Sequence, residues 1–146
     1  MIARALLLVP LLTLGFANRS SAGDILEISP AEYKKAEAMM RHWLRLADKG
    51  KYAESFAAAS ELFRQNSSVE QWSAKHSKML GAGPVVSRGE IASFVPGEKP
   101  NHETLPGSYF VTFKTKFKNK SGVEHVQIVK ENGEWKVAAY SIDIDK

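Results

Sequence analysis

A four-residue stretch, Glu131-Asn132-Gly133-Glu134, constrains the fold more than any other part of the chain. Asparagine and glycine accept the positive backbone angles of a two-residue type I′ turn, and such a turn joins two antiparallel strands. The turn also fixes which residues of the two strands lie opposite one another. The predicted opposite pairs are Lys130 with Trp135, Ile128 with Val137, Val126 with Ala139 and, on the other face, His125 with Tyr140.

The residues before this hairpin predict two further strands. Apolar and polar residues alternate from 109 to 117, a period of two that is typical of a half-buried strand. The connection 118–122 leaves the register of this strand open, and the apolar residues are expected to decide it. A mixed stretch over 85–95 predicts a fourth strand, followed by a loop over 96–106. The expected near pairs are Phe113 with Ile128 and Thr115 with Val126.

These registers divide the strand residues between two faces. The face that the helices should cover has almost nothing ionisable in its middle, because Glu124, Lys130 and Asp143 fall at strand ends. Such a face favours a filled core or an apolar pocket over a catalytic centre. Its predicted members are Tyr109, Val111, Phe113, Phe117, Val126, Ile128, Trp135, Val137 and Ala139. The outer face carries lysines and, at one end, a candidate dimer or partner interface made of Phe110, Val129, Tyr140 and Ile142.

Three helices are predicted upstream of the strands. Ser29 followed by Pro30 and Glu32 is the start signal of the first helix, which should end at Gly50. A second helix is expected over 52–64, and a third begins after Ser68. Each helix has one apolar stripe, so each should lie with one face on the sheet. The predicted fold class is therefore α+β, with three N-terminal helices packed on a curved antiparallel sheet of about four strands.

Residues 1–22 have the pattern of a signal peptide: a short basic start, an apolar run and small residues before Ala22. Cleavage near Ala22 is expected, with a cut after Ala17 or an uncleaved anchor as alternatives, which leaves a single domain over 23–146. The chain has no cysteine, so a disulfide or a lipid-modified cysteine is excluded. The expected location is the bacterial periplasm or the outside of the cell. The net charge is +4 for the whole chain, and it is +2 without Arg4 and Arg19 of the expected signal peptide, which is too mild to indicate a nucleic-acid partner.

No catalytic or cofactor motif occurs in the chain, and no pair of its four histidines has metal-ligand spacing. The acidic tail after residue 142 lacks further ligands for a metal. Lysines at 114, 116, 118 and 120 form a basic strip, either a solvated face or a docking site for an anionic partner or lipid head group. Arg88 lies among apolar residues, so it should either pair with a carboxylate or face a cleft. The candidate pocket or cleft residues are Arg88, Tyr109, Trp72, His76 and Phe113.

Several spaced motifs carry a resemblance to a known family. They are Trp43-x4-Asp48-x-Gly50-x-Tyr52, then Trp72, Gly81 and Arg88, then Leu105-Pro106-Gly107-x-Tyr109, and finally Gly133-x-Trp135-Lys136-Val137-x2-Tyr140. In this order they resemble a bacterial family of exported proteins known as domain of unknown function 4019. The resemblance covers about residues 35–142. It implies a cone-shaped fold of the nuclear-transport-factor-2-like or ketosteroid-isomerase-like kind, with a cystatin-like arrangement as the other option, and it implies no activity.

The function that these observations favour is a non-enzymatic periplasmic module without a cofactor. Its partner would be a small apolar ligand or a protein, and a homodimer is one version of the latter. Two alternatives stay open. One is an isomerase-like or hydrolase-like enzyme with a pocket inside the cone, which would need at least two convergent polar groups in an open cavity. The other is a structural accessory of an envelope complex.

Overall fold

A computed structural model describes residues 28–98 and 104–146. The predicted signal peptide over 1–22 lies outside the described residues, as do His102 and the middle of the predicted loop. The elements are α1 (Pro30–Asp48), α2 (Tyr52–Ala58), α3 (Glu61–Gln65), α4 (Val69–Met79), the short 3₁₀ helix η1 (Leu80–Ala82), β1 (Val85–Glu98), β2 (Thr104–Phe117), β3 (Ser121–Glu131) and β4 (Glu134–Ile144). The predicted α+β class is confirmed.

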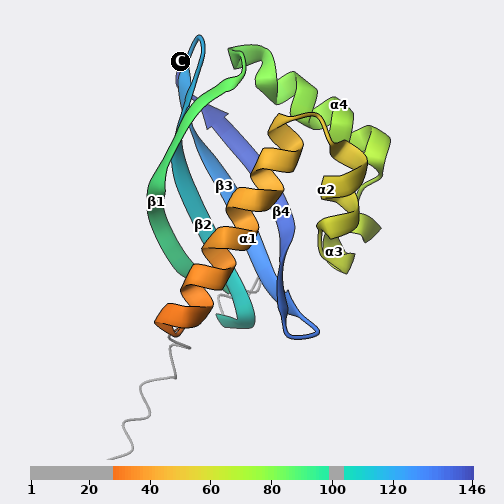
Figure 1. Ribbon diagram of the computed structural model, residues 1–146, viewed down its shortest axis with the longest axis vertical. Coiled ribbons are helices and arrows are strands. Elements are labelled where there is room, and N and C mark those ends of the chain that lie inside the picture. Colours follow the sequence, from red (N-terminus) through yellow and green to blue (C-terminus); the bar gives the residue numbers. More distant parts are fainter. Residues whose placement is uncertain (1–27, 99–103) are drawn as a thin grey trace, which may run out of the picture.

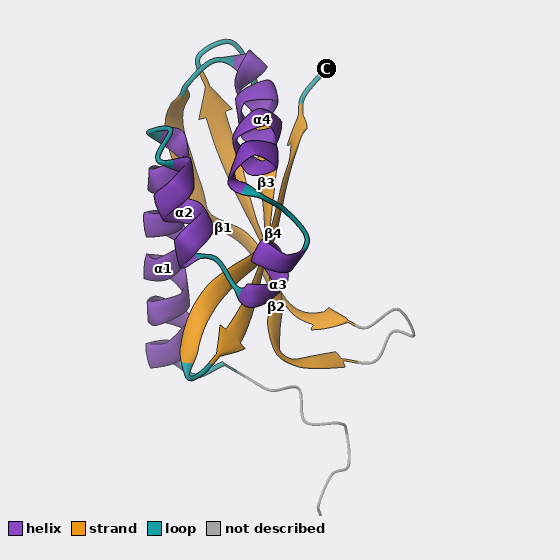
Figure 2. Ribbon diagram, turned by 90° about the vertical axis from the view of Figure 1, so that its right-hand side faces the viewer, coloured by secondary structure: helices purple, strands orange, loops and turns teal. Residues whose placement is uncertain are grey.

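The four strands form one antiparallel sheet in the order β1-β2-β3-β4, so β1 and β4 are its edges. Helix α1 runs diagonally across one face of this sheet, and α2, α3 and α4 lie towards the β4 side (Figure 1). The view from the side shows how strongly the sheet curves (Figure 2). The helices and the curved sheet enclose the core between them.

Helices α1 and α4 begin where their sequence signals place them. The Ser29 hydroxyl accepts a hydrogen bond from the Glu32 backbone N–H at 3.2 Å, and the Ser68 hydroxyl accepts one from Gln71 at 3.1 Å. These bonds satisfy donors that the first turn of a helix leaves free. Gly50 follows α1 with a φ of 71°, the left-handed conformation that a helix end favours.

The single helix predicted over 52–64 is instead two helices. Ala59 is extended, and the Ser60 hydroxyl caps α3 by accepting a hydrogen bond from Phe63 N–H at 3.1 Å. The Ser60 N–H donates to the Val137 carbonyl on the edge strand β4 at 2.9 Å. An edge strand presents unpaired carbonyls, so breaking the helix here satisfies an acceptor on the sheet. The chain therefore has four α-helices among its described residues where the sequence predicted three.

The hairpin at the Asn132-Gly133 turn is confirmed. Both residues have positive φ, 51° and 80°, and the pairs Lys130 with Trp135 and Ile128 with Val137 form as predicted. Ala138 is then an additional residue on β4, because Gln127 pairs with Ala139 rather than with Ala138. This β-bulge reverses which side chains of β4 face the helices.

The pairs predicted beyond the bulge are consequently wrong. Val126 lies opposite Tyr140 and not opposite Ala139, and His125 lies opposite Ser141. Tyr140 faces the helices and is only 5% exposed, whereas Ala139 is exposed.

The register between β2 and β3 also differs from the prediction. Val111 lies opposite Val126 and Phe113 lies opposite Glu124, since β3 already begins at Ser121. The connection is shorter than predicted, with the Phe117 N–H donating to the Lys120 carbonyl at 2.8 Å. The shift is an even number of residues, so the apolar side chains keep their face. Glu124 moves from a predicted strand end to the middle of the covered face, which corrects the expectation that this region lacks an ionisable group.

Aromatic rings fill the space between helices and sheet. The rings of Trp43 and Trp72 stack with centroids 5.1 Å apart, and Tyr140 meets Trp72 edge-on at 5.7 Å. Phe63 packs edge-on against both tryptophans. Trp43 and Trp72 are 1% and 2% exposed, so these rings form a tightly packed cluster.

Candidate functional site

A buried ionic network lies beneath the aromatic cluster. Arg88 on β1 donates from Nε to Glu124 Oε2 at 2.5 Å and from Nη2 to Glu124 Oε1 at 2.9 Å. The same guanidinium donates to both carboxylate oxygens of Asp48, at the end of α1, at 3.1 and 3.3 Å. One arginine therefore makes two forked contacts, the geometry that suits a planar guanidinium best.

Two hydroxyl groups complete the surroundings of Glu124. The Thr115 hydroxyl donates to Oε2 at 2.5 Å, and the Tyr140 hydroxyl donates to Oε1 at 2.6 Å. The side chain of Glu124 is 1% exposed and that of Arg88 is 8% exposed. Each carboxylate oxygen thus accepts two hydrogen bonds away from solvent, which compensates the cost of burying the charge.

The network shifts the pKa of its members in opposite directions. Burial by itself would raise the pKa of Glu124, but the hydrogen bonds and positive charge of Arg88, with those of Thr115 and Tyr140, hold it below the ordinary value of 4.5. Burial and the adjacent Glu124 carboxylate raise the pKa of Tyr140. Burial would lower the pKa of Arg88, yet its contacts with Glu124 and Asp48 raise it. Arginine and glutamate are therefore both charged, and the tyrosine stays a hydrogen-bond donor.

The network takes one side chain from each of five elements, namely α1, β1, β2, β3 and β4. Arg88 takes the first of its two predicted options, because it pairs with carboxylates. Glu124 has no free acceptor and almost no access to solvent, so the network can hold the sheet and α1 together. Proton transfer to a bound substrate would require one of these contacts to open.

A second buried polar group lies between α2 and α4. The Tyr52 hydroxyl is 3.1 Å from His76 Nδ1, and Trp72 Nε1 donates to the Ser55 hydroxyl at 2.9 Å. The Trp43 indole N–H donates to the Ser55 carbonyl at 2.8 Å. Burial lowers the pKa of His76, with Asp48 and Glu124 opposing the shift. His76 is thus a buried, hydrogen-bonded partner of the aromatic cluster.

The structure places the other predicted pocket residues in the core. Phe113 is 0% exposed and lies under the Arg41 guanidinium, 5.2 Å from the ring centroid. Tyr109 is 6% exposed and packs against Phe94 and Trp135. Trp72 borders a surface opening of about 400 Å³ beside α3. Of the predicted pocket residues, Trp72 therefore reaches an opening, whereas Tyr109, His76 and Phe113 are buried in the core.

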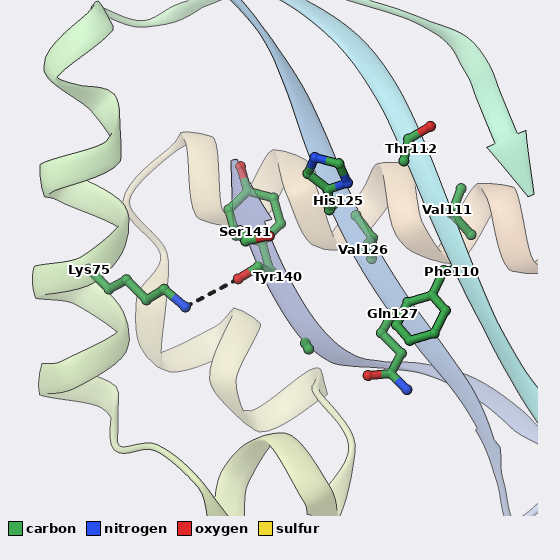
Figure 3. Close-up of a pocket in the computed structure, with 10 residues that line it drawn as sticks. Lys75, Phe110, Val111, Thr112, His125, Val126, Gln127, Tyr140 and Ser141 are labelled. Carbon is green, nitrogen blue, oxygen red and sulfur yellow. Dashed lines mark hydrogen bonds between the residues drawn. The ribbon is translucent and has the colours of Figure 1, made fainter. Parts of the chain in front are cut away.

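An open groove lies on the opposite, outer face of the sheet, and we call it the outer groove (Figure 3). Its volume is about 440 Å³, within the range of small-molecule sites. Phe110 on β2 is 41% exposed and forms one side. Lys75 reaches across from α4, where its ammonium donates to the Tyr140 carbonyl at 3.3 Å. The other lining residues are Val111, Thr112, His125, Val126, Gln127, Ala139, Tyr140 and Ser141.

The four predicted interface residues, Phe110, Val129, Tyr140 and Ile142, do not all lie on one face of the sheet. Phe110 and Val129 share the outer face, but the bulge at Ala138 turns Tyr140 and Ile142 towards the helices. Ala139 and Ser141 take their places on the outer face, and both are small. Small side chains on the edge strand make the outer groove concave.

Sequence reasoning missed Glu124 and Asp48 as partners of Arg88. Glu124 shares the strand parity of Val126 and Ile128, both buried, and an acid on an apolar face requires a partner. Arg88 was the matching unpaired cation, so the two signals together could have indicated the pair. Asp48 gave no such signal because it lies at a helix end.

Two further observations concern metal sites and membrane-spanning helices. In residues 28–98 and 104–146, His, Asp and Glu side chains nowhere gather in groups of three that could hold a metal ion. Over the same ranges, each helix is too short or too polar to cross a membrane.

Comparisons with known proteins give a family and one structural neighbour. The model of a family described as "Protein of unknown function (DUF4019)" matches residues 39–140. No curated protein matches the chain. The structure of Aln2 from a Streptomyces species is similar, with a TM-score of 0.49 and 14% identity over 81% of this chain and 93% of that one. Similarity at that level supports no particular function.

Proposed function

This chain belongs to the DUF4019 family of proteins of unknown function, and from that premise we propose that it is a non-enzymatic module that binds a small, largely apolar ligand. The outer groove is the observation that carries the proposal. It combines an exposed phenylalanine with hydrogen-bonding groups on Thr112, Gln127 and Ser141. Apolar walls with a few polar groups are the usual composition of a ligand site.

The filled core supports binding over catalysis. An enzyme inside the cone would need an open cavity with convergent polar groups. Here the polar groups beneath the helices are paired with one another, and Trp43 and Trp72 occupy the space above them. His125 lines the outer groove, and its Nε2 lies 2.9 Å from Asp143 Oδ2 on side chains that are both exposed. Exposed ion pairs are screened by solvent and do not by themselves indicate a catalytic site.

We also propose a periplasmic location and a cone of the nuclear-transport-factor-2-like kind. The signal-peptide pattern of residues 1–22 and the absence of cysteine support the location. The strongly curved sheet with α1 across one face supports the cone (Figure 2). Mass spectrometry of the protein recovered from the periplasm tests the first: a chain that begins near residue 23 is expected, and an intact Met1 would contradict it.

Titration with a neutral, apolar fluorophore such as N-phenyl-1-naphthylamine tests the outer groove. Ala139→Trp should fill the groove and abolish saturable binding. Ala92→Trp is the matched control, because Ala92 is also exposed on an edge strand but does not line the groove. Equal binding by both variants, or no saturable binding by the wild type, would contradict the proposal.

A protein partner is the second candidate, and one observation favours it. Phe110 is 41% exposed beside Val129 on the same face, and contiguous apolar surface often marks an interface. A second copy of the chain is the simplest partner. Light scattering over a wide concentration range tests this: dimers that Phe110→Lys abolishes would support it, and a strict monomer would rule the dimer out.

A further inference from the structure

A second opening lies on the helix side of β4, at its C-terminal end. It is bounded by the last turn of α4, by η1 and by the end of β4, which lie at the same end of the sheet (Figure 1). Its volume is about 510 Å³. We call it the lysine-rimmed opening, and its lining residues are Lys75, Lys78, Met79, Gly81, Ala82, Lys120, Ile142 and Ile144.

The floor of this opening is apolar. Met79, Ile142 and Ile144 are all half-buried, and Ala82 is 6% exposed. The bulge at Ala138 is the reason that the two isoleucines are here, since it turns them to the same side of β4 as Tyr140. The outer groove lies on the other side of the strand. Lys75 borders both openings, whereas Lys78 and Lys120 border only the lysine-rimmed one.

The rim is cationic, and its three lysines form no ion pair among the described residues. Within the part of the chain that the structure describes, no acidic side chain lies within ion-pair distance of Lys75, Lys78 or Lys120. The three come from separate places: two successive turns of α4 and the connection between β2 and β3. Three ammonium groups without a carboxylate, above an apolar floor, are complementary to a molecule with a negative head and an apolar tail.

We propose that the lysine-rimmed opening binds a free single-chain amphiphile with an anionic head, such as a fatty acid. The tail lies on Met79, Ile142 and Ile144, and the carboxylate lies among the lysines. Lys78 and Lys120 can donate to it, and Lys75, whose ammonium donates to the Tyr140 carbonyl, adds a third positive charge. The volume falls within the usual range of small-molecule sites. A bilayer surface fits less well, because the apolar residues line a hollow and do not project from the surface as a membrane anchor would. This inference does not depend on ligand binding in the outer groove.

Titration of the wild-type protein with dodecanoate, below the concentration at which it forms micelles, tests the proposal. Saturable binding is expected, with chemical-shift changes at Met79, Ala82 and Ile144 in ¹H–¹⁵N spectra. Dodecyltrimethylammonium, which has the same tail and a positive head, should bind at least tenfold more weakly. Raising the salt concentration should weaken dodecanoate binding and leave the cationic probe unaffected or strengthened.

Variants of the exposed rim lysines separate this site from others without perturbing the core. Lys78→Gln and Lys120→Gln should each weaken dodecanoate binding about threefold, and the double variant about tenfold. Lys114→Gln with Lys116→Gln is the matched control, because it removes the same charge from the outer face of β2. Ala139→Trp, which blocks the outer groove, should leave dodecanoate binding unchanged.

Three results would overturn the proposal: no saturable binding of dodecanoate, equal loss in the rim and control variants, or shift changes confined to the outer groove. Binding to phosphatidylglycerol vesicles without binding of monomeric dodecanoate would also overturn it, in favour of a membrane surface. Failure of the fluorophore experiment on the outer groove would leave these outcomes unaffected, so the two ideas can fail separately.

Discussion

Removal of the Arg88 guanidinium should destabilise this fold more than removal of any exposed charge. Arg88→Met keeps the apolar part of the side chain but removes both hydrogen bonds that Arg88 donates to Glu124. The Glu124 side chain is only 1% exposed in the wild type, so the variant leaves a buried carboxylate without its cation. Breaking one partner of a buried ion pair costs about 3–5 kcal/mol of unfolding free energy. Since small domains have only about 5–15 kcal/mol in total, the variant should be close to the limit of folding at neutral pH.

The same structure predicts how the loss depends on pH. In the wild type the pKa of Glu124 is below its ordinary value of 4.5, so its contribution to stability is present above pH 4.5 and is lost as the pH falls. Without Arg88, burial is the dominant influence and should raise the pKa of Glu124. The variant then gains stability relative to the wild type as the carboxylate becomes protonated. The difference between the two proteins should therefore shrink as the pH falls, first through the raised pKa of Glu124 in the variant and then through its lowered pKa in the wild type.

Urea unfolding followed by tryptophan fluorescence measures these differences, because Trp43 and Trp72 lie in the core. A double-mutant cycle with Glu124→Gln isolates the pair, and we expect a coupling energy of about 2 kcal/mol. Arg45→Met is the matched control: Arg45 is exposed, so its loss should cost no more than about 0.5 kcal/mol. A cost of Arg88→Met that is under about 1 kcal/mol, or equal with and without Glu124, would refute the reasoning.

Three further predictions concern single residues. Tyr140→Phe removes a hydroxyl that donates to the buried carboxylate at 2.6 Å and should cost about 1.5–3 kcal/mol by urea unfolding; no loss would contradict the contact. Hydrogen bonds from Lys130, Lys35 and Trp135 lower the pKa of Glu32 to about 2. Glu32→Gln should therefore flatten the fall in unfolding free energy between pH 4.5 and 2. An unchanged slope would argue against this contribution. Gly133→Ala should cost about 1 kcal/mol because φ is +80°, whereas Gly81→Ala should be neutral or stabilising; equal effects would disprove the conformational explanation.

Features that a few adjacent residues determine were predictable from the sequence. The caps at Ser29 and Ser68 and the turn at Asn132-Gly133 formed as expected, because each depends on side chains within three or four positions. The strand pattern and the α+β class followed from periodicity. The break at Ser60 was not predictable locally, since its N–H bonds to Val137 on a strand far along the chain.

The candidate site was harder to predict because its partners come from distant elements. Arg88 was recognised as a cation among apolar residues, but the identity of its partners depended on the register between β2 and β3. That register rested on the length of one connection, and two residues fewer moved Glu124 from a strand end to the middle of the covered face. Because the shift is even, Glu124 faces the helices in either register, and the loop length decided only which residues lie opposite it.

The bulge at Ala138 links the core to both proposed binding sites. With a regular register, Ala139 would face Trp72 and leave a void, while Tyr140 would be exposed. With the bulge, the tyrosine ring is buried, a gain of about 1.5–3 kcal/mol, and its hydroxyl reaches Glu124. The same inversion exposes Ala139 and Ser141 in the outer groove and turns Ile142 into the lysine-rimmed opening. The bulge at Ala138 therefore both fills the core with Tyr140 and shapes the outer groove and the lysine-rimmed opening. The filled core, which argues against catalysis, and the two openings, which argue for binding, have the same structural cause.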